Sequence, residues 1–245
     1  MRVLLVVLLA GAGLVLGPVL RAFAVRLAVP PGRPWRRSCP VCGTSLSLAG
    51  SVLPVTSATG RCSTCRTRVG PPSFTVEVTA AVLLGLLAAR VHPGLTLAAM
   101  CWLAVCAVPL GYIDAVVKRL PNLLTGSALA GTAGLLLIAS AAGGHWSILG
   151  RGLFGGVAFA AFCLVLLLVS PSGMGLGDVK LAASLGAALA WLSWTALIAG
   201  IFAGFLLAAV YGAALLMRGR ANRKTQIPFG PFMIVGTFLV LLIAG

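Results

Sequence analysis

Two aspartates carry the clearest catalytic signal in this sequence. Asp178 lies in GMGLGDVKLAASLG, residues 173–186, and Asp114 lies in GYIDAVVKRLPNLL, residues 111–124, although only three of the 245 residues are acidic. Neighbouring carboxyl groups cannot both ionise cheaply, so one keeps a proton. The charged group can then activate water while the neutral one protonates or polarises an amide. If the two aspartates lie together, they predict aspartic proteolysis.

Each aspartate also has a structural interpretation. Asp178 could simply cap a helix, because Asp is preferred at helix N-termini. Asp114 could pair with Lys118, four residues further along the same helical face. Gly175 and Gly177 favour a shared site, since glycine lets the backbone approach a ligand closely. Because a helix N-terminus favours an anion and a C-terminus disfavours it, we expect Asp178 to be the base and Asp114 to hold the proton.

Four cysteines form a second constellation in the segment 39–66. Cys39 and Cys42 make one C-x2-C pair, and Cys62 and Cys65 make another after 19 intervening residues. Four thiolates at this spacing predict a tetrahedral zinc site that is structural, because it has no open position. Disulfides are the alternative, but a cytoplasmic loop is kept reducing. The remaining cysteines lie in apolar runs and are expected to serve packing; they are Cys101, Cys106 and Cys163.

The elements that must position these residues are apolar runs of bilayer length. Apolar residues make up 60% of the chain and charged residues 9%, and stretches of about 20 uncharged residues recur, which is the length that crosses a hydrocarbon core. We therefore predict an all-α polytopic membrane protein with about eight transmembrane helices and a small four-cysteine cytoplasmic loop. Arg21 and Arg26 fall in the first connection. The predicted segments are roughly 3–20, 75–91, 95–113, 123–142, 152–170, 179–192, 194–217 and 229–244, with a turn near WLSW at 191–194.

This pattern also predicts a division of the chain. We expect a first transmembrane helix over 1–24, a zinc-binding cytoplasmic loop over 25–73, and a seven-helix membrane core over 74–245.

The net charge of +15 sets the orientation. No basic helix or aromatic platform accompanies it, so nucleic acid is not an expected partner. Cytoplasmic loops retain positive charge, and alternate connections divide the Lys and Arg residues 15 to 3, with only Arg2, Arg90 and Arg151 on the poorer side. Both termini are therefore predicted outside and both aspartates at the cytoplasmic surface. His92 and His145 map to the outer side and are not expected to act.

Taken in order, four blocks resemble one family of membrane proteases. They are the four-cysteine loop, Asp114 followed by RLPN, the GMGLGDVKLAASLG block and IPFGPF at 227–232. Together they resemble the prepilin peptidases, the type IV leader peptidases of the GxGD aspartic protease class, over nearly the whole chain. The resemblance implies catalysis by Asp114 and Asp178 in the bacterial inner membrane. It also implies cleavage of type IV prepilins or pseudopilins after a short basic leader that ends in Gly, and contact with pilus or secretion assembly proteins.

Some features depart from that family or leave alternatives. GPVLRAFAVRLAVP at 17–30 stands where an FxNV-like stretch is usual, and VGPPSFTVE at 69–77 lacks the usual Tyr-Pro. Many members also N-methylate the new amino terminus with S-adenosylmethionine, but no glycine-rich loop for that donor is visible, so methylation stays open. Glu77 is expected to pair with loop arginines or to contact substrate or cofactor. The alternative functions are an ion-coupled transporter, since intramembrane carboxylates also mark ion paths, and a zinc-module membrane scaffold.

Overall fold

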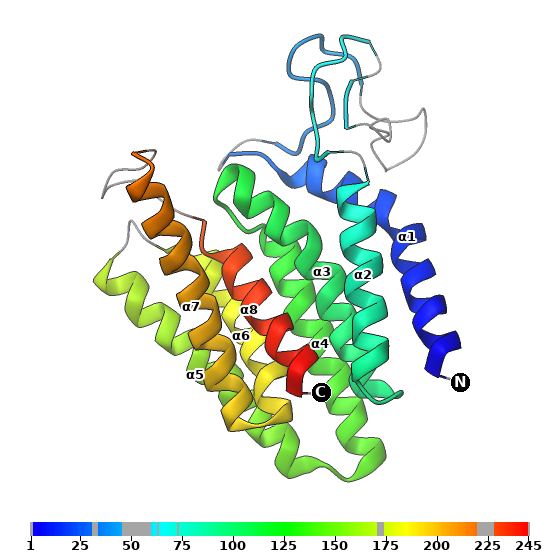
Figure 1. The fold of residues 1–245 in the computed structure, drawn as a ribbon, viewed down its shortest axis with the longest axis vertical. Helices are drawn as coiled ribbons and strands as arrows, with labels where there is room; N and C mark the ends of the chain where they lie inside the picture. Colours follow the sequence, from blue (N-terminus) through cyan, green and yellow to red (C-terminus); the bar gives the residue numbers. More distant parts are fainter. Residues whose placement is uncertain are drawn as a thin grey trace.

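The computed structural model describes residues 2–30, 34–45, 60–62, 64–72, 74–170, 174–219 and 228–244. These residues form eight α-helices and no β-strand beyond two isolated bridges, so the all-α prediction is confirmed (Figure 1). The helices are α1 (Arg2–Leu27), α2 (Thr75–Arg90), α3 (Leu95–Val117), α4 (Asn122–Gly143), α5 (Trp146–Val169), α6 (Leu176–Leu192), α7 (Trp194–Met217) and α8 (Gly230–Ala244).

The helices follow the predicted apolar segments with two differences at their ends. α1 continues to Leu27, so Arg21 and Arg26 lie in the helix and not in the following connection. α5 begins at Trp146, which places Arg151 inside it, where it donates hydrogen bonds to the carbonyls that end α6. Arg21 and Arg151 each find hydrogen-bond acceptors that let a long cationic side chain stay in a helix. The predicted turn at WLSW is the break at Ser193 between α6 and α7.

Five of these helices are long and apolar enough to cross a bilayer: α1, α3, α4, α5 and α7. The other three, α2, α6 and α8, have 16, 17 and 15 residues. Helices of this length are marginal for a hydrocarbon core of about 30 Å. The chain is therefore multi-pass, while the predicted count of eight spans stays a prediction.

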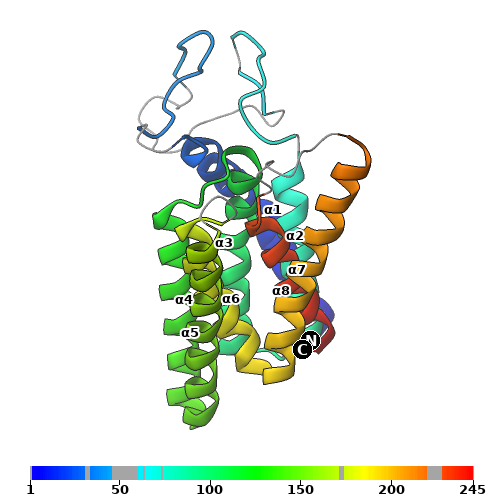
Figure 2. The same cartoon turned by 90° about the vertical axis from the view of Figure 1, so that its left-hand side faces the viewer.

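Successive helices pack in pairs, α1 with α2, α3 with α4, α5 with α6, and α7 with α8. Figures 1 and 2 show both chain termini at one end of the bundle and the cysteine loop projecting beyond the other end. α6 is the most enclosed helix and contacts α3, α4, α5, α7 and α8. Its leucines Leu181, Leu185 and Leu189 are fully buried. The helix that carries Asp178 in its first turn is thus fixed from several sides.

Small residues let the helices approach closely. A Cβ atom at Gly13 of α1 would lie 2.6 Å from the backbone of Ala81 in α2, and one at Gly156 of α5 would lie 2.6 Å from the carbonyl oxygen of Ala183 in α6. In a bilayer, helix association depends on such close van der Waals packing, because lipid is as apolar as the side chains. These contacts hold the bundle in which the aspartates sit.

Candidate active site and cysteine cluster

Asp114 lies in the last turn of α3 and is 4% exposed. Its carboxylate Oδ2 accepts a hydrogen bond of 3.0 Å from the backbone N–H of Gly230, the first residue of α8. Lys118 ends α3 in the left-handed conformation, and its backbone N–H donates to the carbonyl oxygen of Asp114. The aspartate is therefore enclosed between the end of one helix and the start of another.

Asp178 lies in the first turn of α6 and is 7% exposed. Its Oδ2 accepts a 2.9 Å hydrogen bond from the N–H of Gly175, while its own N–H donates to the Gly175 carbonyl oxygen at 3.0 Å. Asp178 thus takes part in capping α6 as the N3 residue of a capping box, but the N-cap residue itself is Gly175 and not Asp178. Its other oxygen, Oδ1, is buried and has no hydrogen-bond partner among the described residues. A buried acceptor without a partner is costly, so this atom is available to a bound water or substrate.

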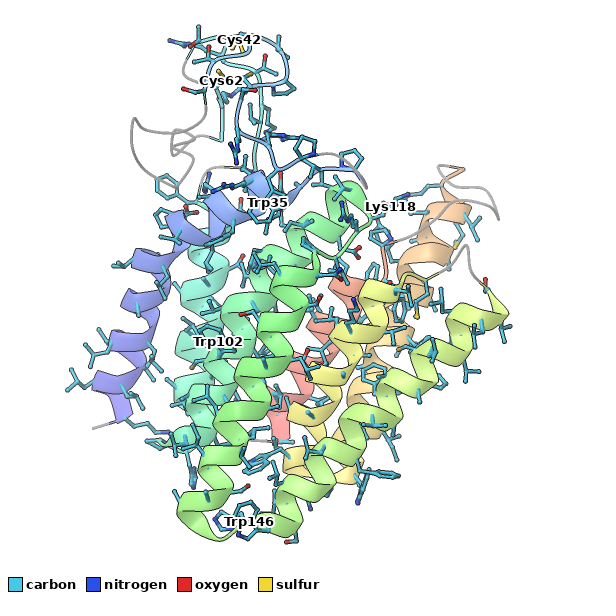
Figure 3. The ribbon with its side chains drawn as sticks, turned by 180° about the vertical axis from the view of Figure 1, so that it is seen from behind. Trp35, Cys42, Cys62, Trp102, Lys118 and Trp146 are labelled. Carbon is cyan, nitrogen blue, oxygen red and sulfur yellow. The ribbon has the colours of Figure 1, made fainter. Side chains whose placement is uncertain are left out.

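The two aspartate segments meet at one end of the bundle. Lys180 Nζ donates to Asn122 Oδ1 at 2.8 Å, and a Cβ atom at Gly177 would lie 2.7 Å from the Cβ of Leu120. Figure 3 shows Lys118, just beyond Asp114, at the same end of the bundle as the cysteine loop. The segments of the two aspartates therefore share one end of the molecule, as the sequence predicted.

The glycines have specific neighbours. Gly177 lies against Leu120, which packs the RLPN segment on the start of α6, and Gly175 donates to Asp178. The neighbours of both glycines are residues of this chain, and a close approach of these glycines to a ligand stays a prediction. Gly230 is the contact that the sequence reasoning missed. The signal was present in IPFGPF, where a glycine between two Pro-Phe steps begins the last apolar run.

Gly230 also changes the argument for the roles of the carboxylates. Asp114 lies near the C-terminus of α3, yet it accepts from the N-terminal amide of α8. Asp178 likewise lies at the N-terminus of α6. A helix N-terminus favours negative charge for either group. The helix dipole alone therefore does not separate an acid from a base in this pair.

The four cysteines lie together at the tip of the loop that projects from the bundle (Figure 3). Their Sγ atoms are all within 4.8 Å of one another, with 3.6 Å between Cys39 and Cys65 and 3.5 Å between Cys42 and Cys62. A tetrahedral zinc ion with Zn–S bonds of about 2.3 Å needs Sγ atoms about 3.8 Å apart. The predicted clustering is confirmed, and the donor set and spacing fit a zinc ion.

The two C-x2-C turns repeat one backbone pattern. The N–H of Cys39 donates to the Thr44 carbonyl at 2.8 Å, and the N–H of Cys62 donates to the Thr67 carbonyl at 2.9 Å. The Cys42 thiol lies 3.2 Å from the Thr44 hydroxyl, and this hydrogen bond lowers the pKa of Cys42 to about 6. The hydrogen bond with Thr67 likewise lowers the pKa of Cys65. Lower thiol pKa values favour the thiolates that bind metal.

Glu77 has a defined partner in α1. Arg21 Nε donates to Glu77 Oε1 at 2.8 Å, and Arg21 Nη2 donates to Oε2. Arg21 is 3% exposed and Glu77 is 8% exposed. The predicted pairing with arginine is therefore found, but the arginine belongs to a helix. Of the cysteines outside the cluster, Cys106 and Cys163 are buried and Cys101 is half-buried.

The family models match two regions that divide along these sites. The model described as the bacterial peptidase A24 N-terminal domain matches residues 12–91, which hold the four cysteines, Arg21 and Glu77. The model described as the type IV leader peptidase family matches residues 97–213, which hold Asp114 and Asp178. The chain belongs to the type IV leader peptidase family. The resemblance and the expected enzyme class, a peptidase, are confirmed.

Curated proteins are similar to this chain over most of its length. It is 31% identical to the prepilin leader peptidase/N-methyltransferase of Aeromonas salmonicida (strain A449), over 84% of this chain and 71% of that protein. Proteins with the same name are 33% identical in Pseudomonas aeruginosa PAO1, over 84% and 70% of the two chains, and 30% identical in Bacillus subtilis (strain 168), over 84% and 81%. No solved structure matches the chain significantly.

Proposed function

We propose that this chain is a membrane-embedded aspartic endopeptidase that removes the short basic leader of type IV prepilin-like proteins after Gly, on the cytoplasmic side. The observation that carries this proposal is the pair of buried aspartates, Asp114 from α3 and Asp178 from α6, at the same end of the bundle. Each is held through one oxygen by a backbone amide. Oδ1 of Asp178, which has no hydrogen-bond partner among the residues that the structure describes, offers an acceptor for the attacking water.

The chemistry needs one ionised and one protonated carboxyl group. The carboxylate takes a proton from water as the water oxygen bonds to the scissile carbonyl carbon, while the carboxylic acid gives its proton to the carbonyl oxygen. In the second step the group that took the water proton gives it to the amide nitrogen as the C–N bond breaks, while the other group, now ionised, takes a proton from one hydroxyl of the tetrahedral intermediate. The products are the leader with a free carboxyl group and the mature protein with a free amine. Coupled titration makes the pair, and not either residue alone, the acid–base unit.

Orientation and location follow from the charge distribution. The predicted inner connections carry 15 of the 18 Lys and Arg residues, and this bias supports the proposal that the aspartates and the cysteine loop lie in or at the cytoplasmic side of the inner membrane. Cys39, Cys42, Cys62 and Cys65 would hold one structural zinc ion. Such an ion would stabilise a loop that is too small to bury its own core, and the proposed catalytic steps do not pass through it.

The test uses purified protein in lipid vesicles with a type IV prepilin as substrate. Asp114→Asn and Asp178→Asn keep the side-chain size but remove proton transfer, so each should abolish leader removal while membrane accumulation stays near normal. Substantial cleavage by either variant would refute the pair. Ion flux across the vesicles without cleavage would instead support the transporter, and neither activity would support the scaffold.

The same assay addresses a second activity. The relatives carry N-methyltransferase in their names, and we propose methylation of the new amino terminus by S-adenosylmethionine as the accompanying reaction. Mass spectrometry of the mature product should then show one additional methyl group only when S-adenosylmethionine is present. An unmethylated product under both conditions would limit the chain to proteolysis.

A further inference from the structure

Gly230 combines three properties that bear on Asp114. It is the first residue of α8, it is buried, and its N–H donates to Asp114 Oδ2 at 3.0 Å across 116 positions of sequence. It also lies beyond residues 97–213, the region that matches the peptidase family model. The contact is therefore made by tertiary packing between the last helix and the end of α3.

The space beside Gly230 is filled by Asp114 itself. A Cβ atom at position 230 would lie 2.8 Å from Oδ2, 3.2 Å from Cγ and 3.5 Å from Cβ of Asp114, and these are the three nearest heavy atoms. Ordinary van der Waals contacts of a Cβ atom begin at about 3.4 Å. Any side chain at 230 would therefore push on the carboxylate.

α8 is itself anchored away from the site. A Cβ atom at Gly236 would lie 2.5 Å from the backbone nitrogen of Gly204 in α7, and one at Gly204 would lie 3.2 Å from the Cα of Met233 in α8. Close packing of this kind fixes one helix against another. The amide of Gly230 is thus presented to Asp114 by a helix whose position does not depend on Asp114.

We infer that Gly230 is a positioning residue for Asp114. Its N–H fixes the direction of the carboxylate, and its missing Cβ leaves the room that the carboxylate occupies. It acts through Asp114 and does not touch the reacting atoms. Asp178 differs because its donor, Gly175, is three residues away in the same helix start. Where it concerns catalysis, this inference rests on the proposed peptidase function.

The test is a double-mutant cycle that has a stability readout and a kinetic readout. Gly230→Ala, Asp114→Ala and the double variant are purified in the same detergent, and their melting temperatures are compared. Gly230→Ala should lower the melting temperature in the wild-type background. The loss should be much smaller in the Asp114→Ala background, because Cγ and both oxygens are gone. Gly13→Ala is the matched control, because its Cβ would lie 2.6 Å from the backbone of Ala81 in the α1–α2 pair and not against α8, so it should cost the same in both backgrounds.

The kinetic readout separates positioning from general damage. A displacement of the carboxylate by a fraction of an ångström should lower kcat for prepilin cleavage by about 10- to 100-fold. KM should stay within about twofold of wild type, because Gly230 does not bind substrate. Gly13→Ala, corrected for the fraction of folded protein, should keep kcat.

Three outcomes would overturn the inference. One is an equal loss of melting temperature in both backgrounds, another is a kcat for Gly230→Ala near that of wild type, and the third is failure of both Gly230→Ala and the double variant to accumulate. Accumulation of the double variant alone would support it, because removal of the Asp114 carboxyl group would have rescued the fold. If the wild-type chain cleaves no prepilin, the proposed function fails, while the stability cycle still decides whether Gly230 and Asp114 are coupled.

Discussion

Glu77→Gln should strongly destabilise the N-terminal helix pair, because it removes one partner of a buried ion pair. Arg21 makes two hydrogen bonds to the Glu77 carboxylate and also donates to the Pro72 carbonyl oxygen at 3.1 Å. A Cβ atom at Gly17 would lie 2.5 Å from Glu77 Cγ, so α1 and α2 leave little room for water. Removal of one member of such a pair costs about 3–5 kcal/mol, because the other charge stays buried without compensation.

The assay is a denaturant titration of purified protein for four chains: wild type, Glu77→Gln, Arg21→Met and the double variant. The double variant should lose less free energy of unfolding than the sum of the single variants, with a coupling of about 2–3 kcal/mol. Leader removal per folded molecule should stay close to wild type, because the pair lies in the N-terminal region and not with the two aspartates. Single losses below about 1 kcal/mol that simply add would refute the ion-pair reasoning. Loss of cleavage without loss of stability would instead assign Glu77 to substrate or cofactor.

Two further predictions concern the cysteine loop. Cys62→Ser should abolish stoichiometric zinc in purified protein and lower its stability, whereas Cys101→Ser, in α3, should keep the metal; elemental analysis decides, and zinc retained by Cys62→Ser would mean that the cluster has been misread. Arg66 and Gly43 occupy equivalent turn positions with φ of 56° and 71°. A non-glycine residue in this left-handed conformation costs roughly 1–2 kcal/mol. Replacing it with glycine removes this strain, but glycine loses more backbone entropy on folding, which offsets part of the gain. Arg66→Gly should therefore stabilise the loop by about 0.5–1 kcal/mol and raise the chelator concentration that removes half the metal about 2- to 5-fold, while Gly43→Ala should lower it; an unchanged value for both would contradict the argument from φ.

The helices were predictable because each apolar run is close to bilayer length and ends at glycine, proline or charge. The cysteine cluster was predictable because two C-x2-C pairs already define a tetrahedral ligand set. Charge bias placed Asp114 and Asp178 at one end of the bundle. In each case the information is local, or it follows from the alternation of spans across the membrane.

The contacts that hold the carboxylates were not predictable in this way. Gly230 and Asp114 are 116 residues apart, and Arg21 and Glu77 are 56 apart. The hydropathy pattern does not predict which helix N-terminus packs against which helix C-terminus. The helix dipole of α3 alone suggested that Asp114 disfavours charge, and only the packing of α8 supplies the opposing amide. Arg21 was assigned to a connection because charge usually ends an apolar run, whereas its buried partner lets the helix continue.

The structure also links the cysteine loop to the segment that carries Asp114. Val25 in α1 packs with Cys39, Cys62 and Val69 of the loop, and just beyond α1 the carbonyl oxygen of Pro30 accepts a hydrogen bond of 3.3 Å from Arg119. Arg119 lies five residues after Asp114 in the connection that packs on the start of α6. Loss of metal therefore has a physical route to the aspartates through the end of α1. This route passes through an exposed hydrogen bond, which is worth only about 0.5–1.5 kcal/mol, whereas Gly230 contacts the carboxylate directly. Loss of zinc should accordingly reduce the amount of folded enzyme more than the turnover of each folded molecule, and a change at Gly230 should do the reverse.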